Sequence, residues 1–85
     1  MKLHFTEGFL GELANLPPHI QDRVQKALRQ LVQDFRYPSL QTKKMKGYSE
    51  IWEARVTEGY RFTFRIEKEY YVLRRVGKHE IEDRP

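Results

Sequence analysis

The chain has 85 residues, of which 39% are hydrophobic, and its net charge is +4. This length fits one domain over residues 1–85, and the hydrophobic fraction excludes wholesale disorder. The chain contains no cysteine, which excludes disulfides, thiolate catalysis and cysteine-based metal sites. No apolar run reaches the roughly 20 residues that span a bilayer, and residues 1–5 lack the features of a secretory signal. We therefore expect a cytoplasmic protein with no membrane partner.

The positive charge is concentrated in the middle of the chain. Residues 1–22 hold one positive and three negative side chains, residues 23–50 seven and two, and residues 51–85 eight and seven. The middle segment includes Lys43, Lys44 and Lys46. Clustered cations are typical of proteins that bind nucleic-acid phosphates. A charge run is also typical of a solvated surface, and composition leaves both interpretations open.

The first half of the sequence predicts a strand and two helices. Residues 2–5 alternate polar and apolar side chains, which indicates a short strand, and Thr6 is a good N-cap for a first helix that ends at Pro17. Proline is tolerated in a first helical turn, so a second helix is expected from Pro18 to near Tyr37, before Pro38. Its apolar stripe consists of Ile20, Val24, Ala27, Leu28, Leu31, Val32 and Phe35.

The second half predicts three strands, over residues 51–56, 60–66 and 70–76, because these runs are rich in aromatic and β-branched residues. A three-residue loop over 57–59 places Ala54 opposite Phe62 and Trp52 opposite Phe64, which keeps the apolar side chains on one face. We expect Gly59 to supply the left-handed residue of this turn. Arg74 and Arg75 are expected on opposite faces of the third strand.

Helices followed by strands predict an α+β fold, with both helices on one face of an antiparallel sheet. Trp52, Phe62 and Phe64 are expected to pack on the second helix. The other face is expected to be rich in arginine and open to solvent; it carries Glu53, Arg55, Arg61, Thr63 and Arg65.

The residues available for chemistry are mainly cations and one histidine. The glycines are isolated, which excludes a phosphate-binding loop, and the three histidines lack metal-ligand spacing, so we expect no metal and no cofactor. Arginines stabilise charge on phosphorus, and a histidine that titrates near neutrality delivers protons. If the 2′-hydroxyl of RNA is the nucleophile, these groups suffice for a ribonuclease. A histidine in the position of His79 is also commonly just an exposed polar residue.

Two segments resemble the RelE/ParE superfamily of toxins from toxin–antitoxin systems: residues 51–64 (IWEARVTEGYRFTF) and 73–79 (LRRVGKH). The turn at 16–21 and the segment 38–40 are also similar, so the resemblance covers nearly the whole chain. It implies a β-α-α-β-β-β layout. It also implies a type II toxin, of the RelE, YafQ and YoeB kind, that cuts mRNA on the ribosome, inhibits translation and is neutralised by a cognate antitoxin.

The resemblance also implies roles for particular residues. Arg61 matches an arginine that stabilises the scissile phosphate, and His79 matches a histidine proposed as the general acid. The RNA contacts implied are Lys43, Lys44, Lys46, Arg55, Arg65 and Arg75. The general base stays unassigned, with Glu50 and Glu53 as candidates.

Other interpretations of the same residues stay open. Arg61 is also interpretable as a surface partner of Glu53 or Glu58, and Arg65 of Glu67, in pairs that contribute little. No aromatic residue follows His79, where several active relatives have one. The alternative functions are therefore a ParE-like inhibitor of DNA gyrase and a catalytically weak, antitoxin-binding relative.

Overall fold

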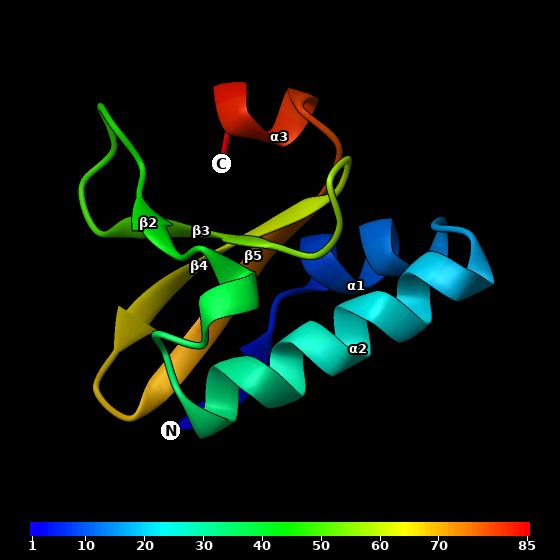
Figure 1. Ribbon diagram of the computed structural model, residues 1–85. Coiled ribbons are helices and arrows are strands. Elements are labelled where there is room, and N and C mark those ends of the chain that lie inside the picture. The colour runs from blue at the N-terminus through cyan, green and yellow to red at the C-terminus, as the bar shows by residue number, and fades with distance from the viewer.

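A computed structural model describes residues 1–85 and confirms the α+β fold (Figure 1). The strands are β1 (Lys2–Phe5), β2 (Lys43–Lys44), β3 (Ile51–Arg55), β4 (Arg61–Glu67) and β5 (Tyr70–Gly77). The helices are α1 (Glu7–Ala14), α2 (Pro18–Gln33) and α3 (Glu80–Asp83), with a 3₁₀ turn over Pro38–Leu40. No helix has the length and apolar character required to cross a membrane.

The five strands form one mixed sheet in the order β1-β5-β4-β3-β2. β1 runs parallel to β5, whereas the other pairs are antiparallel as expected. A parallel pair requires a long connection, and here the chain between β1 and β5 includes α1, α2 and three other strands. The sequence does not reveal this pairing, because the short alternation at residues 2–5 fits either orientation.

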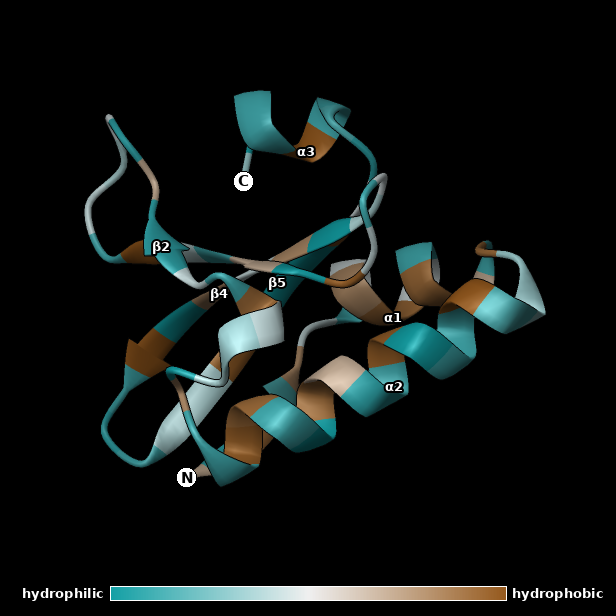
Figure 2. Cartoon of the chain, viewed as in Figure 1, coloured by the Kyte–Doolittle hydropathy of each residue, from teal (hydrophilic) through white to brown (hydrophobic).

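Helices α1 and α2 cover one face of the sheet, and the core lies between them and the strands (Figures 1 and 2). Most of the apolar stripe of α2 faces inward, with Val24 and Leu31 fully buried, but Val32 is 44% exposed. Phe62 and Phe64 of β4 are also fully buried, and Trp52 packs against this core. The predicted core is therefore confirmed except at Val32, which lies outside it.

Local capping sets the bounds of the helices. Thr6 caps α1 as expected, since its Oγ1 accepts a hydrogen bond of 3.2 Å from the Phe9 N–H. α2 ends at Gln33, earlier than the predicted Tyr37, because Asp34 is extended and its carboxylate accepts from the Arg36 N–H at 2.9 Å. Such a local side-chain bond competes with continued helix.

The β3–β4 connection has the expected register, with Ala54 opposite Phe62 and Trp52 opposite Phe64. The expectation for Gly59 is wrong, since Gly47 is the glycine with a positive φ. The Thr57 hydroxyl accepts from the Gly59 N–H at 3.2 Å. This hydroxyl contact stabilises the turn without a left-handed residue.

The sheet face opposite α1 and α2 is partly covered by α3, so the prediction that it is open to solvent is wrong. Thr63 is fully buried there and donates to the Pro85 carbonyl at 3.0 Å. Ile81 of α3 is also fully buried. Helix α3 is not predictable from the sequence, because four helical residues give too little periodicity for a helix to be recognised.

A β-bulge in β5 places both neighbouring arginines on the α3 face. Leu73 lies opposite Phe64 and Val76 opposite Phe62, which leaves two residues of β5 against Thr63 alone. The side chains of Arg74 and Arg75 both reach backbone carbonyls of the segment after α3. The expectation that these arginines lie on opposite faces is therefore wrong, because the extra residue interrupts the alternation.

Candidate functional site

Arg61 begins β4, next to the end of β5. Its strand partners are Arg55 of β3 and Gly77 of β5. The guanidinium is half-buried, and its Nη1 donates to the carbonyls of Thr57 and Tyr60, the latter at 2.9 Å. Neither Nε nor Nη2 has a protein partner, so both are free to bind an anion. Arg61 forms no ion pair with Glu53 or Glu58.

His79 lies two residues beyond Gly77 and immediately before α3. Its side chain is 77% exposed, and its Nδ1 is 3.2 Å from Glu82 Oε1 on α3. A hydrogen bond to this carboxylate requires a proton on Nδ1. Nε2 then points to solvent, where it is available for proton exchange with a ligand.

Glu53 of β3 is a buried carboxyl group on the same sheet face, with 3% of its surface exposed. Its Oε1 is 3.6 Å from Lys43 Nζ, and its Oε2 has no hydrogen-bond partner. Burial raises the pKa of Glu53, and the neighbouring Glu82 carboxyl group adds to the increase, while Lys43 and Arg61 oppose it.

Glu82 and Glu53 behave as a coupled carboxyl pair. The neighbouring Glu53 lowers the pKa of Glu82, and the contact with His79 lowers it further. The two carboxyl groups are therefore shifted in opposite directions, and Glu82, which lies beside His79, is the one that favours the ionised form. We call Lys43, Glu53, Arg61, His79 and Glu82 the charged cluster.

The sequence does not identify a general base and does not point to Glu82. One signal was available, since His79 and Glu82 have the i, i+3 spacing of side chains that meet on a helix. The proximity of Glu53 to Glu82 has no local signal, because it depends on how α3 packs against β4 and β5 of the sheet.

The three lysines expected to bind RNA do not form one site. Lys43 lies opposite Glu53 and Lys44 opposite Trp52, so the two adjacent side chains point to opposite faces of the sheet. Lys46 is exposed in the loop after β2. Only Lys43 joins the charged cluster.

The three remaining arginines expected to bind RNA have different surroundings. Arg55 lines a hollow of ≈ 80 Å³ together with Arg23 and Lys26 of α2. Arg65 Nη2 is 3.7 Å from Glu50, not paired with Glu67. Arg75 is held by Glu12.

The charged cluster offers a cation, a histidine with an ionised partner and a buried carboxyl group within one region. Such a set is suited to binding an anion and transferring a proton beside it. No three histidine, aspartate or glutamate side chains are grouped closely enough to hold a metal ion.

No protein-family model and no curated protein matches this sequence. Solved structures do match its fold. The RelBE2 toxin–antitoxin complex from Mycobacterium tuberculosis includes a chain 26% identical, with a TM-score of 0.75, covering 92% of this chain and 96% of that one. The YoeB/ParE toxin from Agrobacterium tumefaciens is 16% identical, with a TM-score of 0.78 and coverage of 93% and 99%. The RelB–RelE complex from Methanococcus jannaschii includes a chain that is 22% identical, with a TM-score of 0.75. The match covers 96% of this chain and 99% of that one.

These similarities extend over nearly the whole length of each chain. The protein therefore has the fold of the RelE/ParE toxins, as the sequence resemblance implied.

Proposed function

We propose that this protein is the toxin of a type II toxin–antitoxin system and that it cleaves mRNA on the ribosome. The observation that carries the proposal is the placement of Arg61 and His79 at the same end of the sheet in a RelE-like fold. Arg61 pairs with Gly77 across β4 and β5, and His79 follows Gly77 by two residues. A partly free guanidinium and a solvent-facing imidazole therefore lie at the same end of the sheet.

In the proposed reaction, the substrate's 2′-hydroxyl gives its proton to water and attacks the adjacent phosphorus, and the bond between phosphorus and the 5′-oxygen breaks. Nε and Nη2 of Arg61 hold the non-bridging oxygens and stabilise their growing negative charge. Protonated His79 gives a proton to the departing 5′-oxygen. Glu82 keeps the Nδ1 side of the ring occupied, so that Nε2 faces the substrate. The products are a 2′,3′-cyclic phosphate and a 5′-hydroxyl.

The expected protein partner is an antitoxin with an acidic or amphipathic segment. The chain has a net charge of +4, and exposed cations lie on both sides of the sheet edge at Lys43 and Lys44. A disordered acidic segment that folds on binding would neutralise this surface. The RelB–RelE structure from Methanococcus jannaschii and the RelBE2 structure from Mycobacterium tuberculosis are toxin–antitoxin complexes.

Single-turnover cleavage of ribosome-bound mRNA tests the proposal. Arg61→Ala is expected to slow cleavage by roughly 10²–10³-fold, as for loss of an oxyanion donor. His79→Ala is expected to slow it by about 10²–10⁴-fold, the usual contribution of a positioned acid. His19→Ala, which changes an exposed histidine of α2, is the matched control and should cleave at the parental rate.

A folded His79→Ala protein that cleaves at the parental rate would remove His79 from the mechanism. Induced expression of the protein in cells distinguishes the nuclease from a gyrase inhibitor. Translation arrest with cut mRNA supports the nuclease. DNA breaks with intact mRNA would instead favour a gyrase inhibitor.

A further inference from the structure

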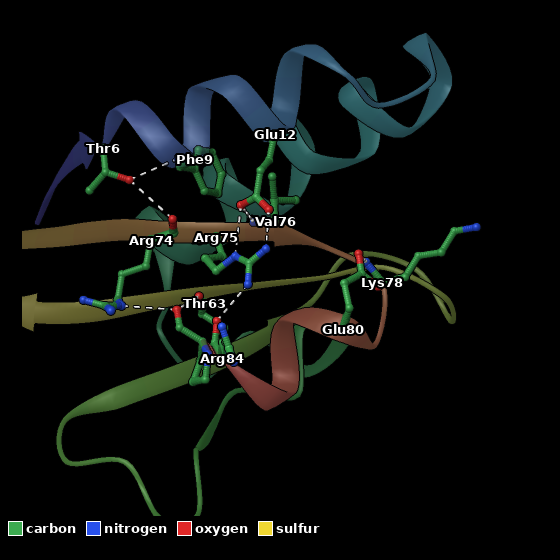
Figure 3. Close-up of polar contacts among 11 residues, drawn as sticks. Thr6, Phe9, Glu12, Thr63, Arg74, Arg75, Val76, Lys78, Glu80 and Arg84 are labelled. Atoms are coloured by element: carbon green, nitrogen blue, oxygen red, sulfur yellow. Dashed lines mark hydrogen bonds and ion pairs between the residues drawn. The ribbon is translucent and has the colours of Figure 1, made fainter.

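The largest hollow in the protein lies at the other end of α3 from His79. Its volume is ≈ 440 Å³, and its polar lining comes from Thr6, Tyr48, Arg74, Arg75 and Arg84. This volume falls in the range of pockets that hold small organic ligands. We call it the arginine pocket; Figure 3 shows most of its polar contacts.

Arg75 lines the arginine pocket, but its guanidinium is held by other residues and is not free to bind a ligand. Its Nε and Nη2 donate to the Glu12 carboxylate at 3.3 and 2.7 Å, and its Nη1 donates to the Arg84 carbonyl at 2.9 Å (Figure 3). The hydrogen bond and charge of Glu12 raise the pKa of Arg75. The pair is neutral as a whole, so Arg75 holds the segment after α3 in place.

Two guanidiniums at the arginine pocket remain available. Arg74 uses its Nε to bind the Pro85 carbonyl at 3.2 Å, while its two Nη groups have no protein partner. The Arg84 side chain has no ion pair or hydrogen bond, and this residue is exposed. No side-chain carboxylate is paired with either cation, because Glu12 is engaged by Arg75 and by the Val76 N–H. Two unpaired arginines around one hollow match the geometry of a phosphate group.

Tyr48 adds an aromatic surface beside these cations. Its hydroxyl donates to the Asp83 carbonyl at 2.6 Å, which fixes the ring at the pocket, and 39% of the residue is exposed. Rings in this setting stack on unpaired bases.

We propose that the arginine pocket binds a phosphate group of a ribonucleotide, with Arg74 and Arg84 on the phosphate and Tyr48 against the base. The ligand is a nucleotide of the RNA that flanks the cut, so the assignment rests on the proposed function. Arg74 and Gly77 are three residues apart on β5, or roughly 10 Å. One RNA strand along this face therefore contacts both the charged cluster and the arginine pocket.

Binding measured by calorimetry tests the proposal without requiring cleavage. The probes are inorganic phosphate, adenosine monophosphate and a short RNA with a 2′-O-methyl group at every position. Arg84→Gln is expected to weaken binding of the RNA about tenfold, the effect of a lost charged hydrogen bond. Arg29→Gln changes an exposed arginine of α2 and should leave the affinity within twofold of the parent. Tyr48→Leu should weaken binding of adenosine monophosphate and RNA but not of inorganic phosphate.

The outcomes separate this proposal from the proposed nuclease. Arg61→Ala should slow cleavage by roughly 10²–10³-fold, while adenosine monophosphate still binds in an Arg84-dependent way. Arg84-dependent binding of the mononucleotide without binding of the RNA would support the phosphate site and identify a free nucleotide as its source. Equal weakening by Arg84→Gln and Arg29→Gln would show that only total charge matters and overturn the proposal. Absence of binding by all three probes would overturn it as well.

Discussion

Replacing Gly77 by alanine tests how tightly α3 is held against the sheet. Gly77 lies at the end of β5, and a Cβ atom there would be 2.9 Å from Glu80 Oε1 and 3.1 Å from Ile81 Cγ2. Glu80 is already constrained, since its Oε1 accepts from the Lys78 N–H at 3.2 Å. Ile81 is fully buried. Gly77 does not have a positive φ, so the cost arises from lack of space and not from backbone strain.

Overpacking of this kind costs about 1–3 kcal/mol, and we expect Gly77→Ala to lower the free energy of unfolding within that range. The matched control is Gly11→Ala on α1, where no atom lies within 4 Å of the new Cβ. That change should instead raise the free energy of unfolding by roughly 0.5–1 kcal/mol, because alanine is the better helix former.

Urea denaturation measures both variants, and amide hydrogen exchange at Ile81 reports directly on α3. If Gly77→Ala matches the parent in stability and Ile81 exchanges as slowly as before, α3 is not packed on β5 as described. If the two variants change stability in the same direction, the contrast between a crowded and an open glycine is refuted.

Three further predictions concern the core, the buried carboxyl group and the lysines. Phe62→Ala removes a buried ring 5.9 Å from Phe64 and should lower the free energy of unfolding in urea by about 3–5 kcal/mol; an unchanged midpoint would contradict the packing. Burial raises the pKa of Glu53 above its ordinary value of 4.5, so the folded chain holds that proton more tightly. The resulting stabilisation is complete below pH 4.5 and is lost as pH rises through the folded pKa. Urea titrations from pH 4 to 7 should show a smaller decline in Glu53→Gln, and an identical decline would refute the assignment. RNA affinity should fall with salt, and Lys46→Ala should reduce that slope by about one if Lys46 contacts a phosphate; an unchanged slope would exclude the contact.

The sequence predicts the core and most of the strand register because both depend on local, repeating patterns. Ala54 and Phe62 were matched by keeping apolar side chains on one face, and that constraint holds in the structure. The end of α2 was misplaced by four residues because a single side chain, Asp34, competes with the helix.

The candidate site was predictable only in part. Arg61 and His79 were identified from a motif, and their proximity follows from the β4–β5 pairing. Glu82 was missed because its contacts with Glu53 and His79 depend on how a four-residue helix docks. The resemblance implies that Arg75 contacts RNA, and its ion pair with Glu12, 63 residues away, has no local sequence signal.

The extra residue at the bulge in β5 places two arginines, instead of one, on the α3 face of the sheet. Without Arg74, the order Leu73, Arg75, Val76 would alternate regularly between the core and the α3 face, in step with Phe64, Thr63 and Phe62. A one-residue deletion would thus give a more regular strand that still satisfies the core. The deletion would instead change the arginine pocket. The pocket would keep Arg75, which Glu12 neutralises, and would lose Arg74, whose Nη groups are free. Deletion of Arg74 would therefore remove a free guanidinium from the pocket while the core side chains on both sides keep their register.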